Sequence, residues 1–132
     1  MKILKTILAL FISFTATAQA VQDITYFDIP TDQVGEFIQT HKKFMDATMN
    51  DSRTVQGQWV YRHFYGSGAS VAVFTEFANI NDAVNDDPWA SLRSKWQSSN
   101  EDERKELEAL GQKYASFLVN HSDDIRSFDF EN

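Results

Sequence analysis

The sequence predicts an α+β fold in which two helices cover one face of an antiparallel sheet, with the elements in the order βαββαβ. Three observations predict it. Short β-prone segments carry alternating apolar positions, two longer segments carry apolar positions spaced three and four apart, and turn residues separate the segments. The length of 132 residues suits one domain of modest core size.

The first twenty residues have the features of a secretory signal peptide. Lys2 and Lys5 supply positive charge, residues 7–14 form a short apolar core, and Ala18-Gln19-Ala20 offers small residues to a peptidase. An amphipathic first helix is the alternative, but the end of this segment has no helical stripe. We therefore expect cleavage after Ala20, which leaves residues 21–132 as a single domain.

The composition restricts the partners of that domain. Removal of residues 1–20 leaves ten Lys and Arg residues against nineteen Asp and Glu residues, a formal net charge of −9. Such an acidic balance argues against nucleic acid and anionic membranes as partners. The sequence contains no cysteine, which excludes disulfides, cysteine catalysis and a lipid-anchored cysteine. We expect a soluble protein in the periplasm or outside the cell, with no membrane contact after cleavage.

The first strand is predicted at residues 24–29, which are β-prone, and Pro30 ends it. Thr31 could then cap a helix. The apolar positions of this helix follow a spacing of three and four: Val34, Phe37, Ile38, Phe44, Met45 and Met49. That stripe would lay the helix on the sheet.

Two further strands are predicted at residues 55–65 and 69–77. The turn Gly66-Ser67-Gly68 joins them, so they should form a β-hairpin. Asn79 or Asn81 could start a short helical turn after the hairpin.

The last third of the chain predicts two helical segments and a closing strand. Asp87 and Pro88 are typical of a helix start, and Trp89, Leu92 and Trp96 lie along one side of that helix. Asn100 and the acidic residues after it mark the start of a longer helix. Its apolar stripe consists of Leu107, Leu110, Tyr114, Phe117 and Leu118. Residues 122–124 should end this helix, and residues 125–130 should form the last strand.

This element order is that of the ferredoxin-like arrangement, in which the helices cover one face of the sheet. The other face also has apolar residues. The strand at residues 69–77 places Val71, Val73 and Phe77 on one side, but Ala72 and Phe74 on the other. A sheet that is apolar on both faces is usually buried on both. We therefore predict a homodimer that closes sheet against sheet into a barrel.

The chain resembles the dimeric α/β-barrel superfamily, which includes antibiotic-biosynthesis-type monooxygenases, haem-degrading monooxygenases and stress-responsive barrel proteins. The resemblance rests on the element order, on the strands at residues 59–62 and 71–77, and on the closing segment at residues 121–125. It implies small ligands in a cleft between helices and sheet. For some members, it implies oxidation of activated substrates without a metal or flavin.

Haem-degrading members of this superfamily carry an axial histidine on the helical segment after the central hairpin. In this sequence that segment holds Trp89 and Trp96, and its histidine is His121, at the far end. We therefore expect no haem and no other cofactor. No pair of His or acidic residues has the spacing of a metal site, so we expect no metal either.

Two groups of residues could carry chemistry. His41 lies at helical spacing from Val34, Ile38 and Met45, so it should point toward the sheet, as a proton acceptor or as a hydrogen-bonded core histidine. Strict alternation places four residues on one face of the second strand: Trp59, Tyr61, His63 and Tyr65. This aromatic stripe suits a planar ligand or the core of a dimer.

Two acid–histidine relationships follow from the predicted elements. A two-residue hairpin turn would place Glu76 opposite Trp59, where its carboxylate could orient an imidazole. His121 lies near the end of the last helix, where the helix dipole and Asp123 or Asp124 would favour its charged form, most simply as a structural cap.

Our leading hypothesis is an exported homodimer that binds a small apolar or aromatic molecule in the cleft facing His41. The candidate ligand-binding residues are Trp59, Tyr61, Tyr65, Trp89 and Trp96. A second hypothesis is a cofactor-independent oxygenase that acts on an activated aromatic or quinol substrate, with His41 or His63 as the catalytic base. A third is a non-catalytic interaction protein.

Overall fold

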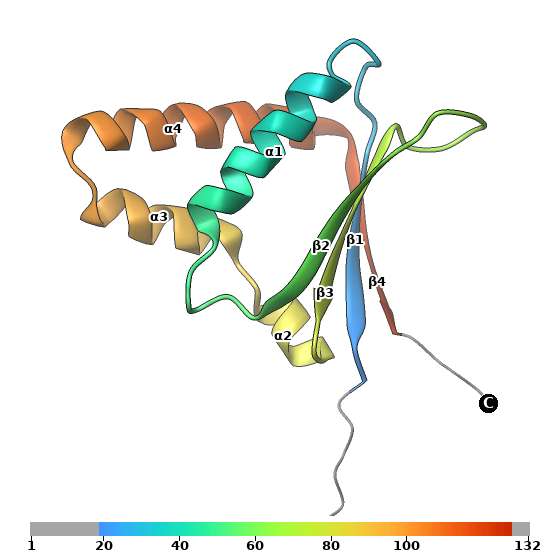
Figure 1. Ribbon diagram of the computed structural model, residues 1–132, viewed down its shortest axis with the longest axis horizontal. Helices are drawn as coiled ribbons and strands as arrows, with labels where there is room; N and C mark the ends of the chain where they lie inside the picture. Colours follow the sequence, from blue (N-terminus) through green and yellow to red (C-terminus); the bar gives the residue numbers. More distant parts are fainter. Residues whose placement is uncertain (1–18, 128–132) are drawn as a thin grey trace, which may run out of the picture.

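In the computed structural model, which describes residues 19–127, four antiparallel strands form one sheet and the helices lie on one side of it (Figure 1). The strands are β1 (Val21–Phe27), β2 (Val55–Arg62), β3 (Val71–Phe77) and β4 (His121–Ser127). Their order across the sheet is β2-β3-β1-β4. This order and the βαββαβ sequence of elements confirm the ferredoxin-like α+β fold.

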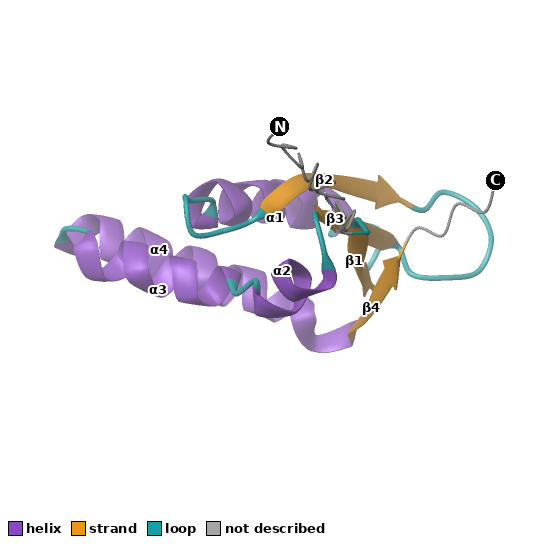
Figure 2. Cartoon of the chain, turned by 90° about the horizontal axis from the view of Figure 1, so that it is seen from below, coloured by secondary structure: helices purple, strands orange, loops and turns teal. Residues whose placement is uncertain are grey.

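The helices are α1 (Val34–Thr48), α2 (Ile80–Asn85), α3 (Pro88–Ser98) and α4 (Glu101–Ser116), and a 3₁₀ turn (Phe117–Asn120) follows α4. Figure 2 shows α1, α3 and α4 on the same side of the strands. Three helix starts are confirmed by side-chain caps. Asn79, Asp87 and Asn100 each accept a hydrogen bond from a backbone N–H in the first turn.

The expected cap of the first helix is wrong. Thr31 lies in a turn before α1, and Gln33 occupies the cap position without a side-chain hydrogen bond. The backbone N–H of Gln33 donates to the carbonyl of Pro30 at 2.8 Å. This turn delays the helix to Val34, so the hydroxyl of Thr31 does not cap it.

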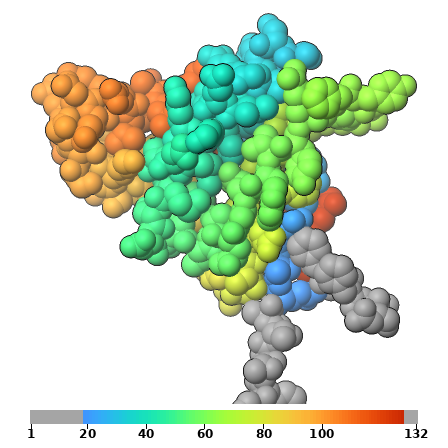
Figure 3. All heavy atoms as spheres, in the orientation of Figure 1, coloured from blue at the N-terminus to red at the C-terminus, as the bar shows by residue number. Residues whose placement is uncertain are grey.

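The connection between the two strands of the hairpin is longer than the sequence predicted. β2 ends at Arg62 and β3 begins at Val71, so residues 63–70 form the connection. This segment projects from the body of the molecule, in light green (Figure 3). His63 closes this loop, because its ring contacts the carbonyl oxygens of Tyr65 and Ala69. Gly66 and Gly68 adopt φ angles of 96° and 138°, which side chains rarely tolerate.

The closing strand starts earlier than expected. β4 begins at His121, which pairs with Phe27, so Asp123 and Asp124 lie within the strand and do not end a helix. The chain leaves α4 at Ser116 and makes a 3₁₀ turn, which keeps Phe117 in the core. The expected end of the strand at Phe130 lies outside the described residues, as do residues 1–18 of the expected signal peptide.

The core lies between the helices and the sheet. Alternation along β3 buries Val71, Val73 and Phe77 against the helices, as predicted. The largest buried side chains on this side are aromatic: Phe27, Phe37, Phe44 and Phe77. The opposite face of the sheet carries large exposed apolar residues, Trp59 and Tyr61, which are 44% and 57% exposed. Among residues 19–127, therefore, the helices cover one face of the sheet and leave the other accessible.

Candidate functional site

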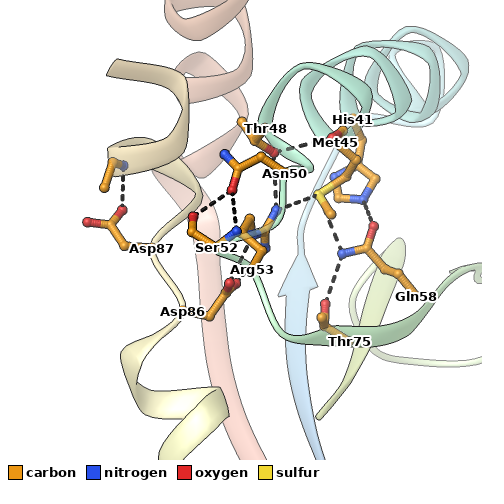
Figure 4. Close-up of polar contacts among 11 residues, drawn as sticks. His41, Met45, Thr48, Asn50, Ser52, Arg53, Gln58, Thr75, Asp86 and Asp87 are labelled. Carbon is orange, nitrogen blue, oxygen red and sulfur yellow. Dashed lines mark hydrogen bonds and ion pairs between the residues drawn. The ribbon is translucent and has the colours of Figure 1, made fainter. Parts of the chain in front are cut away.

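A buried polar network joins α1 to the sheet (Figure 4), and a hydrogen bond of the same network joins α1 to α4. His41 is only 4% exposed, and its Nε2 lies 2.8 Å from Oε1 of Gln58. Nε2 of Gln58 donates to Oγ1 of Thr75 at 2.9 Å, so its Oε1 is the acceptor toward His41. The imidazole therefore carries its proton on Nε2, and Nδ1 accepts a hydrogen bond from the Tyr114 hydroxyl at 3.0 Å.

Both ring systems of this network are held neutral. Burial lowers the pKa of His41, and the hydrogen bond with Gln58 opposes this shift only in part. Burial likewise raises the pKa of Tyr114 far above its ordinary value. The arrangement is that of a satisfied core histidine, since each ring nitrogen of His41 has a partner.

The space beside His41 is filled by aromatic rings. The ring of Tyr114 stacks on Phe44 with centroids 4.0 Å apart, and Phe37 stacks on His41 at 5.7 Å. Trp89 packs against Phe44 at 4.8 Å, so this predicted ligand-binding residue belongs to the core. The cleft expected at His41 is occupied by these side chains.

A buried ion pair lies at the other end of the network (Figure 4). The guanidinium of Arg53 donates to both carboxylate oxygens of Asp86, at 2.8 and 2.5 Å, and to Oγ1 of Thr48 at 3.1 Å. The side chains of Arg53 and Asp86 are only 4% and 9% exposed. The pair ties the loop before β2 to the loop between α2 and α3, and it lies beside a polar surface hollow of about 770 Å³.

A second hollow lies on the sheet face that the helices leave uncovered. It has a volume of about 720 Å³, and we call it the open-face hollow. Its lining comes from β1, β2, β3 and the hairpin loop: Gln22, Tyr26, Trp59, Tyr61, Arg62, His63, Gly68, Ala69, Ala72, Phe74 and Glu76. Aromatic rings dominate this surface, and Tyr61 packs edge-on against Phe74 with centroids 5.0 Å apart.

The position of Trp59 in the hollow depends on a glycine. A Cβ added at Gly57 would lie 2.9 Å from Cη2 of Trp59, so the indole lies directly over this residue. The ladder between β2 and β3 is irregular between Val55 and Gly57. A side chain at position 57 would displace the indole from the sheet.

The pairing of β2 with β3 corrects one expectation. Trp59 pairs with Phe74, and Glu76 pairs with Gly57, because the connection is centred between Gly66 and Ser67, one residue earlier than a pairing of Trp59 with Glu76 requires. Glu76 therefore does not lie opposite Trp59. It nevertheless faces the same side of the sheet and lines the open-face hollow.

The structure brings only some of the predicted site residues together. Trp59, Tyr61 and His63 line the open-face hollow, whereas Tyr65 is 95% exposed in the hairpin loop and does not line it. Trp96 lines a separate apolar hollow of about 340 Å³ between α3 and α4, where its Nε1 donates to Glu108. His41 lies on the opposite side of the sheet, within the core.

Several lining residues of the open-face hollow were not predicted, notably Gln22 and Tyr26. The position of Tyr26 on this face was predictable, because alternation along β1 places it on the face opposite to Phe27. Its pairing with Ala72, which places it across this small residue from Tyr61, could not be read from one strand alone.

His121 lies at the start of β4, where its Nδ1 contacts the carbonyl oxygen of Leu118 and its Nε2 lies 3.4 Å from Oδ2 of Asp123. It joins the 3₁₀ turn to the strand. Within residues 19–127, no three His or acidic residues lie together in a way that could hold a metal ion. None of the helices described for this chain is both long and apolar enough to cross a membrane.

Comparisons with known proteins identify the fold. No family model and no curated protein sequence matches the chain. Among solved structures it is similar to a dimeric ferredoxin-like protein from an uncultured marine organism, with a TM-score of 0.52 and 6% identity over 87% of this chain and 91% of that one. The hydroxynitrile lyase of Passiflora edulis gives a TM-score of 0.51 and 8% identity over 86% of this chain and 97% of that one.

A third similar structure is a dimeric protein of unknown function and ferredoxin-like fold from Bacteroides fragilis NCTC 9343. Its identity is 16% and its TM-score 0.49, with 83% of this chain and 96% of that chain covered. At these identities the likeness concerns the fold alone. The likeness to the marine protein confirms the ferredoxin-like fold.

Proposed function

We propose that this protein is an exported homodimer that binds a small apolar or aromatic molecule on the open face of its sheet. The observation that carries the proposal is the open-face hollow, where Trp59 and Tyr61 remain largely exposed around a volume of about 720 Å³. Exposed aromatic surface of this kind is typical of ligand sites and of interface cores.

The same face supports the homodimer. Trp59 and Tyr61 are exposed on this face of β2 beside Phe74, and a large exposed apolar patch on a soluble monomer is uncommon. The marine protein that shares this fold is described as dimeric. Two copies that met through this face would cover their aromatic residues and would enclose the two hollows between the sheets.

The proposed ligand position differs from the cleft at His41 that we first expected. Around His41 the aromatic rings of the core fill the space, and both ring nitrogens already have partners. A ligand there would have to break buried hydrogen bonds, which is costly. The open face requires no such disruption, because Tyr61 and Trp59 are accessible before a ligand arrives.

A cofactor-independent oxygenase is the second candidate. The observation that favours it is the histidine at the edge of the open-face hollow, because a general base must lie within reach of its substrate. His41 is neutral because burial lowers its pKa, but both of its ring nitrogens are already bonded within the core. His63 at the edge of the open-face hollow is the other candidate base. Oxygen uptake with a quinol substrate would be measured for the wild type, His41→Ala and His63→Ala, and uptake that survives both substitutions would exclude these roles.

Export to the periplasm or the medium is part of the proposal. It rests on the positive, apolar and small-residue segments of residues 1–20. Intact-mass measurement on protein recovered from each cell fraction tests it. We expect a chain that begins at Val21 outside the cytoplasm, and a full-length cytoplasmic chain would contradict export.

The binding proposal is tested on the mature protein by native mass spectrometry and fluorescence titration with naphthalen-1-ylmethanol, a neutral aromatic probe. We expect the mass of a dimer and saturable binding that weakens at least tenfold in Trp59→Ala. Trp96→Ala is the matched control, because Trp96 lies in the separate hollow between α3 and α4. A monomer without saturable binding would overturn the proposal and would leave the non-catalytic interaction protein as the better hypothesis.

A further inference from the structure

We infer that the open-face hollow selects organic cations, in particular aromatic amines, through the carboxylate of Glu76 and the indole of Trp59. The inference rests on the proposed function and narrows the class of ligand. Four features carry it: an unpaired carboxylate, an aromatic face beside it, the position of the nearest cationic side chains and the net charge of the protein.

Glu76 is a partly buried acid near the end of β3, an inner strand of the sheet. It pairs with Gln22 of β1 on one side and with Gly57 of β2 on the other, and it lines the open-face hollow. Within residues 19–127 its carboxylate has no hydrogen bond and no ion pair to another side chain. The carboxylate is accessible from the hollow, so it is free to accept a charge-assisted hydrogen bond from a cationic ligand.

The aromatic face lies next to this carboxylate because of Gly57. The indole of Trp59 lies directly over Gly57, and Gly57 is the cross-strand partner of Glu76. Because Gly57 has no side chain, it places nothing between the indole of Trp59 and the carboxylate of Glu76. An ammonium group could therefore meet the carboxylate and the face of the indole together, which combines an ion pair with a cation–π contact.

The cationic side chains that line the hollow lie at its other end. Arg62 is five residues from Gly57 along β2, which is roughly 16 Å at the usual rise of a strand. Its guanidinium carbon lies 5.4 Å from the centre of the Phe64 ring in the hairpin loop. The ring of His63 is directed at carbonyl oxygens of that loop.

Arg126 lies nearer to Glu76, across Gln22 on the same face, but its guanidinium is paired with Asp124 at 2.6 Å. Within residues 19–127, none of these three groups forms an ion pair with Glu76.

The overall charge acts in the same direction. Without residues 1–20 the chain has a formal net charge of −9, and an acidic protein raises the local concentration of cations near its surface. This long-range attraction is not selective by itself. The difference in affinity between a cationic and a neutral ligand of the same shape must therefore come from Glu76.

Three naphthalene probes of nearly equal shape test the inference on the mature protein at pH 7 and low salt. They are naphthalen-1-ylmethylamine, which is cationic, naphthalen-1-ylmethanol, which is neutral, and naphthalene-1-carboxylate, which is anionic. We expect the amine to bind at least tenfold more tightly than the alcohol, and the carboxylate to bind most weakly. Added salt should reduce the advantage of the amine.

Two substitutions separate Glu76 from the general charge. Glu76→Gln should bring the dissociation constant of the amine to that of the alcohol and leave the alcohol unchanged. Glu106→Gln removes one negative charge from an exposed position on α4, so it should leave the preference for the amine intact. Native mass spectrometry of each variant reports the oligomeric state.

The outcomes distinguish this inference from the proposed function. If the amine and the alcohol bind equally well to the wild type, and both lose affinity in Trp59→Ala, the binding site is supported but the cation selectivity is overturned. Absence of binding by all three probes would overturn the proposed function itself. A third outcome would also overturn the inference. If the wild type shows no preference for the amine and Glu76→Gln no longer forms a dimer, Glu76 contacts a second copy of the chain instead of a ligand.

Discussion

The hydroxyl of Tyr114 lies 3.0 Å from Nδ1 of His41 and joins α4 to α1 across the core, although the two residues are 73 positions apart. Tyr114→Phe would remove this donor and leave Nδ1 buried without a partner, while the ring could still stack on Phe44. We expect a loss of about 1–3 kcal/mol in the free energy of unfolding, measured with urea. Tyr65→Phe in the exposed hairpin loop is the control, and an equal loss in both variants would contradict this role of the hydrogen bond.

His41 should make the stability depend on pH. Because burial lowers its pKa, the folded state disfavours the protonated imidazole relative to the unfolded chain, where the ordinary value is 6.5. This contribution to stability is fully present above about pH 6.5 and is lost as the pH falls toward the lowered pKa of the folded state. Urea unfolding between pH 8 and 5 should show the decline in the wild type. A His41→Gln variant with the same slope would rule out His41 as its source.

Asp23 should affect the pH dependence of stability in the opposite direction to His41. It lies on the face of β1 that the helices cover, and its pKa is raised from 3.8 by burial, with smaller effects from the charges of Asp123 and Asp86. The ionised carboxylate therefore costs stability at neutral pH. Asp23→Asn should raise the melting temperature at pH 7, and its advantage should vanish near pH 3. Asp32→Asn, at an exposed position, should change the melting temperature little at either pH.

The ion pair of Arg53 with Asp86 should be costly to break from one side. Asp86→Asn leaves a buried guanidinium without its counter-charge, so we expect a loss of about 3–5 kcal/mol in the free energy of unfolding. The exposed pair of Lys42 with Asp46 is the matched control, where Asp46→Asn should cost less than about 1 kcal/mol. Urea unfolding of both variants measures the difference.

A double substitution tests the reason for that cost. In Arg53→Met with Asp86→Leu, neither charge remains to be buried, so much of the lost stability should return. A double variant as unstable as Asp86→Asn alone would mean that the hydrogen bonds of the pair hold the loops before β2 and before α3 in place.

The elements that the sequence predicted well are those fixed by local chemistry. Asn79, Asp87 and Asn100 cap their helices because a short polar side chain can reach a free N–H of the first turn, and this pattern is visible in a few residues. The inward position of His41 followed from helical spacing in the same way. Alternation likewise placed Trp59 and Tyr61 on one face of β2.

The errors arose where the answer depends on distant parts of the chain. The apolar stripe of α4 continues through Phe117, so the sequence did not show that the helix ends at Ser116. The pairing of Glu76 with Gly57 depends on where the hairpin connection is centred along the chain, which the loop around His63 sets. The partnership of Tyr114 with His41 leaves no local pattern at all, because it is created by the packing of α4 on α1.

The pairing of β1 with β4 has a consequence for how the chain acquires its structure. Val21 lies opposite Ser127, so this ladder connects positions that are separated by almost the whole domain. During synthesis, one edge of β1 has no partner until β4 has emerged, and contacts of such long sequence separation form slowly. A chain interrupted before His121 would leave that edge bare, and exposed strand edges recruit other chains. Incomplete products should therefore be the main source of aggregates.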